Sequence, residues 1–109
     1  MSEQEMNSMD EYTIRVRGGE VPTDATNLSL SILHVLRKNP HGFVVLLSVG
    51  PKALNSVMTA YRLAAMETQK HTDATVLVLR QSEYIAEIAG RKTKGLSSRI
   101  FPIPIQHAL

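Results

Sequence analysis

The sequence predicts an α/β protein, a two-layer sandwich with the element order β-α-β-α-β-β and both helices on one face of a mixed sheet. Short apolar runs alternate with segments of helical spacing, glycine or proline separates them, and each helical segment lies between two predicted strands. Strand–helix–strand connections make parallel neighbours with right-handed crossovers, which places both helices on the same face. At 109 residues, 43% of them hydrophobic, the chain is long enough for one domain and one core.

The first strand and helix follow directly from side-chain spacing. Residues 12–17 alternate apolar and polar side chains, which predicts a half-buried strand ending at Gly18-Gly19. Thr23 or Asp24 is the expected N-cap of a helix whose apolar stripe runs through residues 25–36. Asn39-Pro40 ends that helix.

The middle of the chain is more apolar. Residues 42–49 read GFVVLLSV, which predicts an inner strand. Gly50-Pro51 then begins a second helix that extends to about Thr68, with proline at the first helical position. Residues 74–79 predict a third strand.

The C-terminal part is less regular. Residues 84–89 fit either a short helix or a strand that enters a hairpin, and residues 90–95 form a glycine-flanked loop with cations at its tip. Residues 100–105 predict the last strand, but Pro102 and Pro104 cannot donate hydrogen bonds on the side they share. We therefore expect pairing on that side to end near Phe101, giving a short final strand or a locally open sheet.

The charges are distributed unevenly. Residues 1–10 predict a disordered acidic tail before a single domain at residues 11–109. All 12 basic residues but only 6 of the 10 acidic ones follow residue 11, so the net charge of +2 becomes +6 there. A clustered positive field attracts polyanions such as nucleic acid, although a solvated surface explains charge alone equally well. The sequence shows no secretory signal and no membrane span, so we expect a cytoplasmic protein that does not contact a membrane.

Catalytic and metal-binding patterns are missing from the sequence. It has no cysteine, its four histidines are not spaced as metal ligands, and its carboxylates are scattered. No nucleophile elbow, phosphate loop or zinc-protease motif occurs. We therefore expect no enzyme activity, no metal and no cofactor.

Two segments have the chemistry of phosphate contacts. At Gly50-Pro51 a strand leads at once into a helix, and Lys52 and Asn55 lie in the first turn, where exposed N–H groups favour anions. The alternative is an ordinary turn with an exposed lysine. Arg91, Lys92 and Lys94 form the cationic tip of the predicted loop, which is either an arm that follows a nucleic-acid backbone or a solvated hairpin end. Further cations lie beside the first loop and before the last strand, at Arg15, Arg17 and Arg99.

Residues 48–57 resemble the stage V sporulation protein S motif, in which a strand, a glycine, two residues and Ala-Leu-Asn lead into an alanine-rich helix. Residues 14–16 and the Val35-Leu36-Arg37 end of the first helix resemble the same family, so that the likeness spans about residues 12–105. The sequence departs from that family in the first loop, where Glu20 follows Gly18-Gly19, and in a longer arm.

The family is in turn similar to Alba chromatin and RNA-binding proteins. This resemblance implies a dimer that binds DNA or RNA through the loop after the first strand, the start of the second helix and the arm between the last two strands. In this sequence those regions are Arg17 with Gly18-Gly19, Lys52 with Asn55, and residues 91–94. The last strand of such a sheet is internal.

Two hypotheses follow. The first is a non-catalytic, largely sequence-nonspecific DNA- or RNA-binding protein that acts as a homodimer or higher homo-oligomer, nucleoid-associated if bacterial, with a regulatory role in sporulation or development implied by the resemblance. Its binding residues are Arg15, Arg17, Lys52, Asn55, Arg91, Lys92, Lys94 and Arg99. The alternative is a protein-interaction or oligomerisation module without nucleic-acid affinity.

Overall fold

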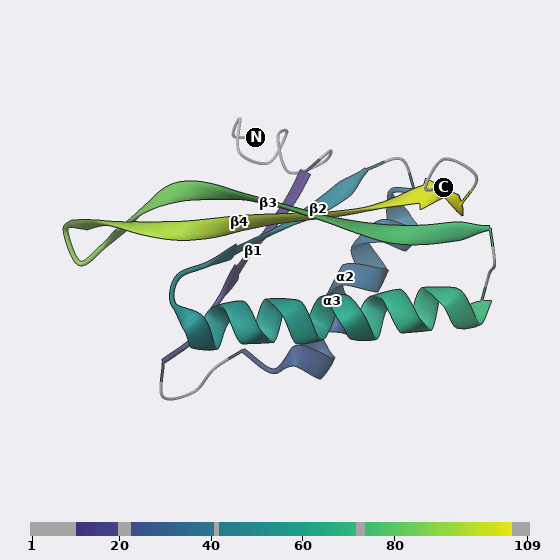
Figure 1. Ribbon diagram of the computed structural model, residues 1–109, viewed down its shortest axis with the longest axis horizontal. Coiled ribbons are helices and arrows are strands. Elements are labelled where there is room, and N and C mark those ends of the chain that lie inside the picture. Colours follow the sequence, from purple (N-terminus) through teal and green to yellow (C-terminus); the bar gives the residue numbers. More distant parts are fainter. Residues whose placement is uncertain (1–10, 20–22, 41, 72–73, 106–109) are drawn as a thin grey trace.

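The protein forms the predicted two-layer sandwich (Figure 1). The computed structural model describes residues 11–19, 23–40, 42–71 and 74–105. Its elements are β1 (Glu11–Val16), α2 (Ala25–Lys38), β2 (Phe43–Ser48), α3 (Pro51–His71), β3 (Thr75–Ile88) and β4 (Arg91–Pro104). The predicted order β-α-β-α-β-β is confirmed. The predicted tail at residues 1–10, and Glu20 and Pro22 of the first loop, lie outside the described residues.

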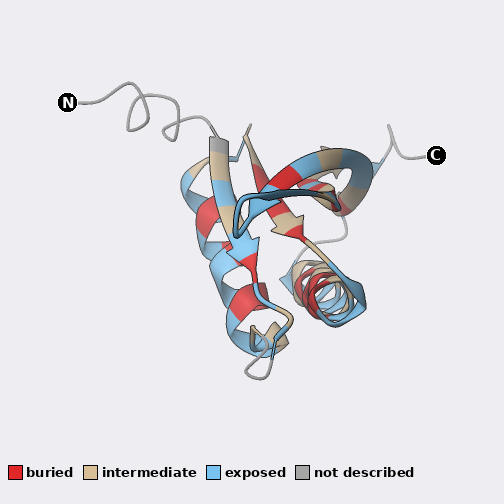
Figure 2. Ribbon diagram, turned by 90° about the vertical axis from the view of Figure 1, so that its left-hand side faces the viewer, coloured by how far each residue is buried: buried red, intermediate tan, exposed pale blue. Residues whose placement is uncertain are grey.

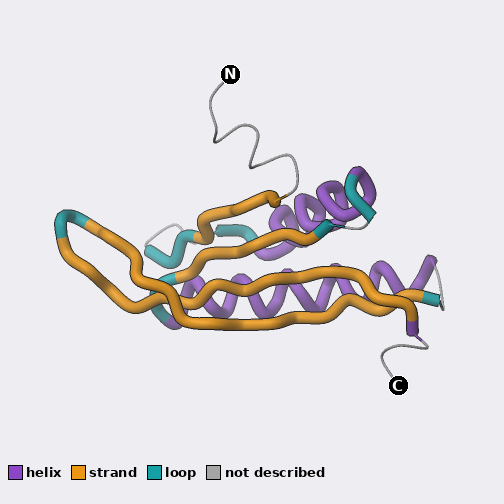
Figure 3. Tube along the Cα trace, turned by 90° about the horizontal axis from the view of Figure 1, so that it is seen from above, coloured by secondary structure: helices purple, strands orange, loops and turns teal. Residues whose placement is uncertain are grey.

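The four strands form one mixed sheet in the order β1-β2-β4-β3. β1 pairs parallel with β2, whereas β4 pairs antiparallel with both β2 and β3. Both helices lie on one face, and Figure 3 shows the strands with the helices behind them. The opposite face, which we call the open face, carries no helix.

The core lies between the helices and the inner side of the sheet. Five of its side chains are completely buried and come from four elements: Ile32, Val44, Leu46, Val57 and Ile100. α3 contributes small residues where it crosses the sheet, since Ala53, Ala60 and Ala64 are also fully buried. Figure 2 shows the buried side of each helix turned toward the core. This packing fixes the start of α3 against the end of β1.

The loop from β1 to α2 is closed by local hydrogen bonds. Asp24 is the N-cap of α2, and its carboxylate accepts from the backbone N–H of Thr26 at 2.8 Å. Thr23 has a different role, because its hydroxyl accepts from the backbone N–H of Arg17 at 2.7 Å and its own N–H donates to the Arg17 carbonyl at 3.0 Å. Of the two predicted capping residues, Asp24 thus caps α2 and Thr23 ties the loop to the end of β1.

The third strand is longer than the predicted residues 74–79, and of the two alternatives for residues 84–89 the strand that enters a hairpin is confirmed. The prediction of a loop at residues 90–95 is wrong. β3 continues to Ile88, β4 begins at Arg91, and only Ala89 and Gly90 connect them. Both residues have positive φ, 52° and 77°, which is the conformation of a two-residue hairpin turn that follows the twist of the strands. Arg91, Lys92 and Lys94 therefore lie on a strand. We call the part beyond the last β2–β4 pair, Tyr84–Gly95, the arm; Figure 1 shows it projecting past the helices.

The final strand is long, contrary to the expectation of a short one, but its pairing ends where the prolines predict. β4 is 14 residues long and internal, and its pairing with β2 ends at Ile100. Ile105 donates its N–H to Ala74 on the β3 side, so the alternate nitrogens of Pro102 and Pro104 face the β2 side. The sheet is open there, as predicted, while pairing with β3 continues to Pro104.

Candidate nucleic-acid interface

The three segments singled out in the sequence lie at one end of the molecule. The end of β1 packs on the start of α3, because a Cβ at Gly18 would lie 2.6 Å from the backbone nitrogen of Ala53. The arm reaches the same helix end, where Lys94 and Gly95 line a hollow of about 200 Å³ together with Gly50. Only glycine fits at position 18 with this spacing. The absence of a side chain there lets the first loop lie against the start of α3.

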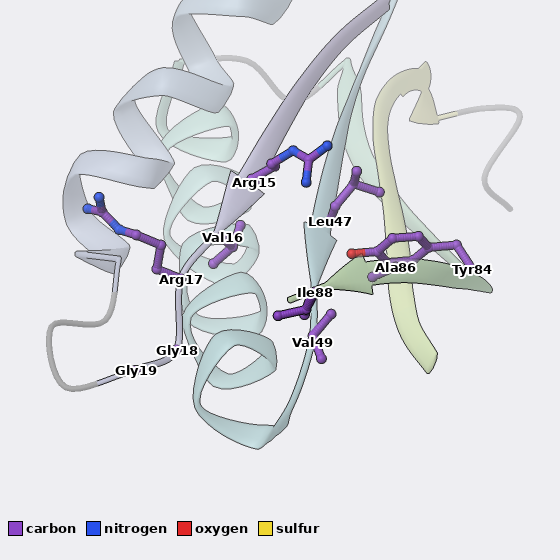
Figure 4. A pocket seen from close by; sticks show the side chains of 10 residues that line it. All are labelled: Arg15, Val16, Arg17, Gly18, Gly19, Leu47, Val49, Tyr84, Ala86 and Ile88. Carbon is purple, nitrogen blue, oxygen red and sulfur yellow. The ribbon is translucent and has the colours of Figure 1, made fainter. Parts of the chain in front are cut away.

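A larger hollow of about 460 Å³ joins the first loop to the arm (Figure 4). Leu47 and Val49 of the β2 end form its floor, and Tyr84, Ala86 and Ile88 of the arm line the other side. The Arg15 side chain extends toward the arm, whereas Arg17 points away from the other labelled residues. Arg15 thus faces this hollow with its side chain, whereas Arg17 lines it mainly with its backbone.

The start of α3 differs from the predicted open anion site. Pro51 has no N–H to donate, and Ala53 is fully buried with Gly18 against its nitrogen. The exposed polar side chains at this end are those of Lys52 and Asn55. The cation that this helix end presents is therefore the Lys52 side chain.

Alternation along β4 divides the arm cations between its two faces. Arg91 is opposite Ile88, Lys92 is opposite Glu87, and Lys94 is opposite Ile85. Lys92 and Lys94 consequently share one face and Arg91 lies on the other. All three cations are exposed, and the apolar neighbours Ile85 and Ile88 are 60% and 50% exposed. The arm therefore combines positive charge with uncovered apolar surface.

Gly95 sits at the root of the arm. A Cβ there would lie 2.6 Å from Cε1 of Tyr84, the residue opposite it, and 2.8 Å from the carbonyl oxygen of Ser48. The glycine lets the Tyr84 ring lie across β4 and lets β4 approach the end of β2. Gly95 is thus a packing position in a strand and not, as predicted, the flank of a loop.

The comparison with solved structures agrees with this architecture. No protein-family model matches the chain, and no curated protein matches it. The structure of Alba from Thermoplasma volcanium is similar with a TM-score of 0.50 at 12% sequence identity, covering 83% of this chain and 94% of that one. The fold is Alba-like. At this identity the likeness concerns the arrangement of the elements alone.

Within the Alba-like fold, Arg99 lies apart from the end that carries the arm. Its guanidinium stacks over the ring of Phe43 at 4.2 Å from the centroid, on the open face. Arg80 lies directly opposite Arg99 on β3 and was not among the predicted site residues. Only the strand register reveals this pair, because the two arginines are 19 positions apart in the sequence and lie outside any motif.

Among the described residues, a shifted pKa is found at Glu67, at the end of the Alba-like fold opposite the arm. The hydrogen bond from His71 and the charge of Lys70 lower the pKa of Glu67 below its ordinary value. The Glu67 carboxylate is 3.0 Å from the His71 ring nitrogen and 3.6 Å from the Lys70 ammonium. All three are at the C-terminal end of α3, where this exposed triad stabilises the last turn.

Other ligand chemistry is limited in the part of the chain that the structure describes. There, no group of three or more His, Asp or Glu side chains is arranged to hold a metal ion. Neither α2 nor α3 is long and apolar enough to cross a membrane.

Proposed function

We propose that this protein is a non-catalytic DNA- or RNA-binding protein that holds phosphate groups at the end carrying the arm. The observation that supports it most directly is the convergence of the first loop, the start of α3 and the arm at that end. Among the described residues, cations outnumber carboxylates there, with Arg15, Lys52, Arg91, Lys92 and Lys94 against Glu83 and Glu87. The resemblance to Alba proteins implies contacts from the same three regions.

The mechanism is neutralisation of backbone phosphates. Lysine and arginine side chains displace condensed counterions from the nucleic acid, which favours binding without reading the sequence. The two faces of the arm divide this task, because Lys92 and Lys94 reach one side and Arg91 the other. Arg15, turned toward the arm, adds a cation across the hollow between them. Such an interface tolerates any sequence and prefers a shape that fits around the arm.

The protein acts as a homodimer in this proposal. Apolar side chains remain exposed on α3, where Leu63 is 37% and Met66 is 58% exposed, and on α2, where Leu30 is 59% exposed. A second copy that covers such residues gains free energy from removing them from water. The same exposed residues support the alternative function, an oligomerisation module without nucleic-acid affinity.

Cytoplasmic location, and the narrower relationship to stage V sporulation protein S with a role in sporulation or development, are part of the same proposal. They are supported by the Ser48–Val57 motif and by the sequence expectations above. The arm cations, one arginine and two lysines, do not distinguish DNA from RNA, so both are candidate partners.

Fluorescence anisotropy with labelled duplex DNA, duplex RNA and single strands of one sequence tests the proposal. For about four phosphate contacts we expect affinity to fall about a hundredfold between about 50 and 200 mM salt. If the protein binds none of these nucleic acids at the lower salt concentration, the proposal is excluded. An oligomer of salt-independent mass by light scattering, without such binding, would establish the alternative.

A further inference from the structure

The open face of the sheet carries two arginines that directly oppose each other. Arg80 of β3 and Arg99 of β4 are partners in the antiparallel register, and both are exposed. The next pair on the same face is Ser82 and Ser97. These four residues alone line a hollow of about 310 Å³, which is positive and rich in hydrogen-bond donors.

In the described part of the chain, no carboxylate forms an ion pair with either arginine. Like charges directly opposite on a sheet destabilise it, yet both ion pairs among the described residues involve Glu67 at the far end of α3. Arg99 is held in place by the ring of Phe43, 4.2 Å below its guanidinium. A second hollow of about 260 Å³, lined by Phe43 and Phe101, lies on the other side of the same two arginines. The pair therefore presents positive charge between two surface hollows, with Arg99 held against an aromatic ring.

We propose that Arg80, Arg99, Ser82 and Ser97 form a binding site for a phosphate group. Guanidinium groups present planar sets of N–H donors that match the oxygens of a phosphate, and the two hydroxyls add donors on the same face. The bound anion also offsets the repulsion between the arginines. A cross-strand pair with this chemistry holds a phosphate monoester or diester, or inorganic phosphate, through charge and donor geometry.

The position of the site favours a phosphate group from the backbone of a nucleic-acid strand. This choice of ligand rests on the proposed function. Tyr84, which lines the hollow beside the arm, lies on the same face two residues beyond Ser82. The distance along β3 from Tyr84 to Arg80 is therefore about 13 Å. A strand bound at the arm can continue along the open face and place a later phosphate between the arginines.

Two-dimensional NMR of the full chain tests the site with inorganic phosphate as the probe, replacing chloride at constant ionic strength. We expect saturable shifts at the Arg80 and Arg99 side-chain Nε–H and at the Ser82 and Ser97 amides. Arg80→Gln abolishes these shifts, whereas Arg62→Gln, an exposed arginine on α3, leaves them intact. Linear shifts without saturation, or the same saturable shifts in Arg80→Gln, would overturn the site.

The variant also reports on the repulsion. Because Arg80 is exposed, Arg80→Gln keeps the fold, and its melting temperature at low salt equals or exceeds that of the unmodified protein. Added phosphate then raises the melting temperature less in Arg80→Gln than in Arg62→Gln. An equal rise in both variants contradicts binding at the arginine pair.

An oligonucleotide without terminal phosphates distinguishes a nucleic-acid strand from a free phosphate as the ligand of this site. Shifts at Arg80 and Arg99 with both probes, and a salt slope that is smaller by about one in Arg80→Gln, support a nucleic-acid strand. Shifts with inorganic phosphate alone support a free phosphate ligand. If the oligonucleotide shifts only the arm and phosphate shifts nothing, this site fails and the proposed function stands. If phosphate saturates the site and no nucleic acid binds anywhere, the proposed function fails and the site stands.

Discussion

The two halves of the β3–β4 hairpin are built from continuous strands but have opposite surroundings. In the proximal half, Thr75–Leu79 pairs with Ile100–Pro104, and Ile100 and Leu77 lie under the helices with 0% and 7% exposure. In the arm, Tyr84–Ile88 pairs with Arg91–Gly95 beyond the last contact with β2. There Ile85 is 60% exposed, and the neighbouring cations face solvent.

Under the proposed function, this contrast separates the half of the hairpin that stabilises the fold from the half that would bind a partner. The proximal half gains its free energy from apolar burial, whereas the arm extends past the helices and pairs with no third strand. The arm is held mainly by backbone pairing along 14-residue strands that the core anchors at the other end. An element of this kind contributes little to the core and exposes its side chains for a partner.

The largest effect is expected in the proximal half. Ile100→Ala removes a completely buried side chain and lowers the free energy of unfolding by about 2–5 kcal/mol. Ile85→Ala in the arm is the matched control and changes it by less than about 0.5 kcal/mol. Urea denaturation measures both. Equal losses from the two substitutions would show that the arm is packed as tightly as the core.

The boundary between the halves is expected to give an intermediate effect. Gly95→Ala forces a Cβ against the Tyr84 ring and the Ser48 carbonyl, which destabilises the protein by about 1–3 kcal/mol. Gly19→Ala serves as the control, because a Cβ there has no neighbour within 4 Å. Thermal unfolding of both variants compares the two glycines; a melting temperature for Gly95→Ala equal to that of Gly19→Ala contradicts the close packing at the arm root.

The smallest effect is expected at the tip of the arm. Ala89 has φ 52°, and Ala89→Gly relieves this strain by up to about 1 kcal/mol. Amide hydrogen exchange near the turn, at Ile88 and Arg91, then slows by up to about fivefold, while exchange at Ile100 stays the same. Faster exchange at the turn would show that alanine is the better residue at this position.

The sequence predicted the packed part of the fold better than the exposed arm. Both helices and the first two strands were predicted near their observed ends, because apolar residues recur with a clear period in the helices and the first strand and form a continuous run in the second strand. The arm was predicted in part, because a strand entering a hairpin was one of two alternatives for residues 84–89 whereas residues 90–95 were predicted as a loop. Residues 80–95 are mostly exposed, and Ala89-Gly90 lacks the asparagine or aspartate typical of such turns. Arg80 was missed for a related reason, since its relation to Arg99 exists only in the strand register.

The convergence of the first loop, α3 and the arm was also beyond the sequence. It depends on close approaches that two glycines permit, Gly18 against Ala53 and Gly95 against Ser48. Spacing alone identified the cations, and the resemblance to Alba proteins grouped them. The Arg15 side chain turns toward the arm and that of Arg17 does not, which depends on the three-dimensional arrangement and not on spacing.

The central claim is that the arm, and not positive charge in general, binds nucleic acid. The direct measurement is the salt dependence of duplex binding for two triple variants. One changes the arm cations to glutamine, at Arg91, Lys92 and Lys94; the other changes three exposed cations near the C-terminal ends of the helices, Arg37, Lys38 and Lys70. We predict that the arm variant lowers the slope of log affinity against log salt by about 2.7 and that the helix-end variant keeps the original slope. Equal slopes for the two variants would contradict the claim.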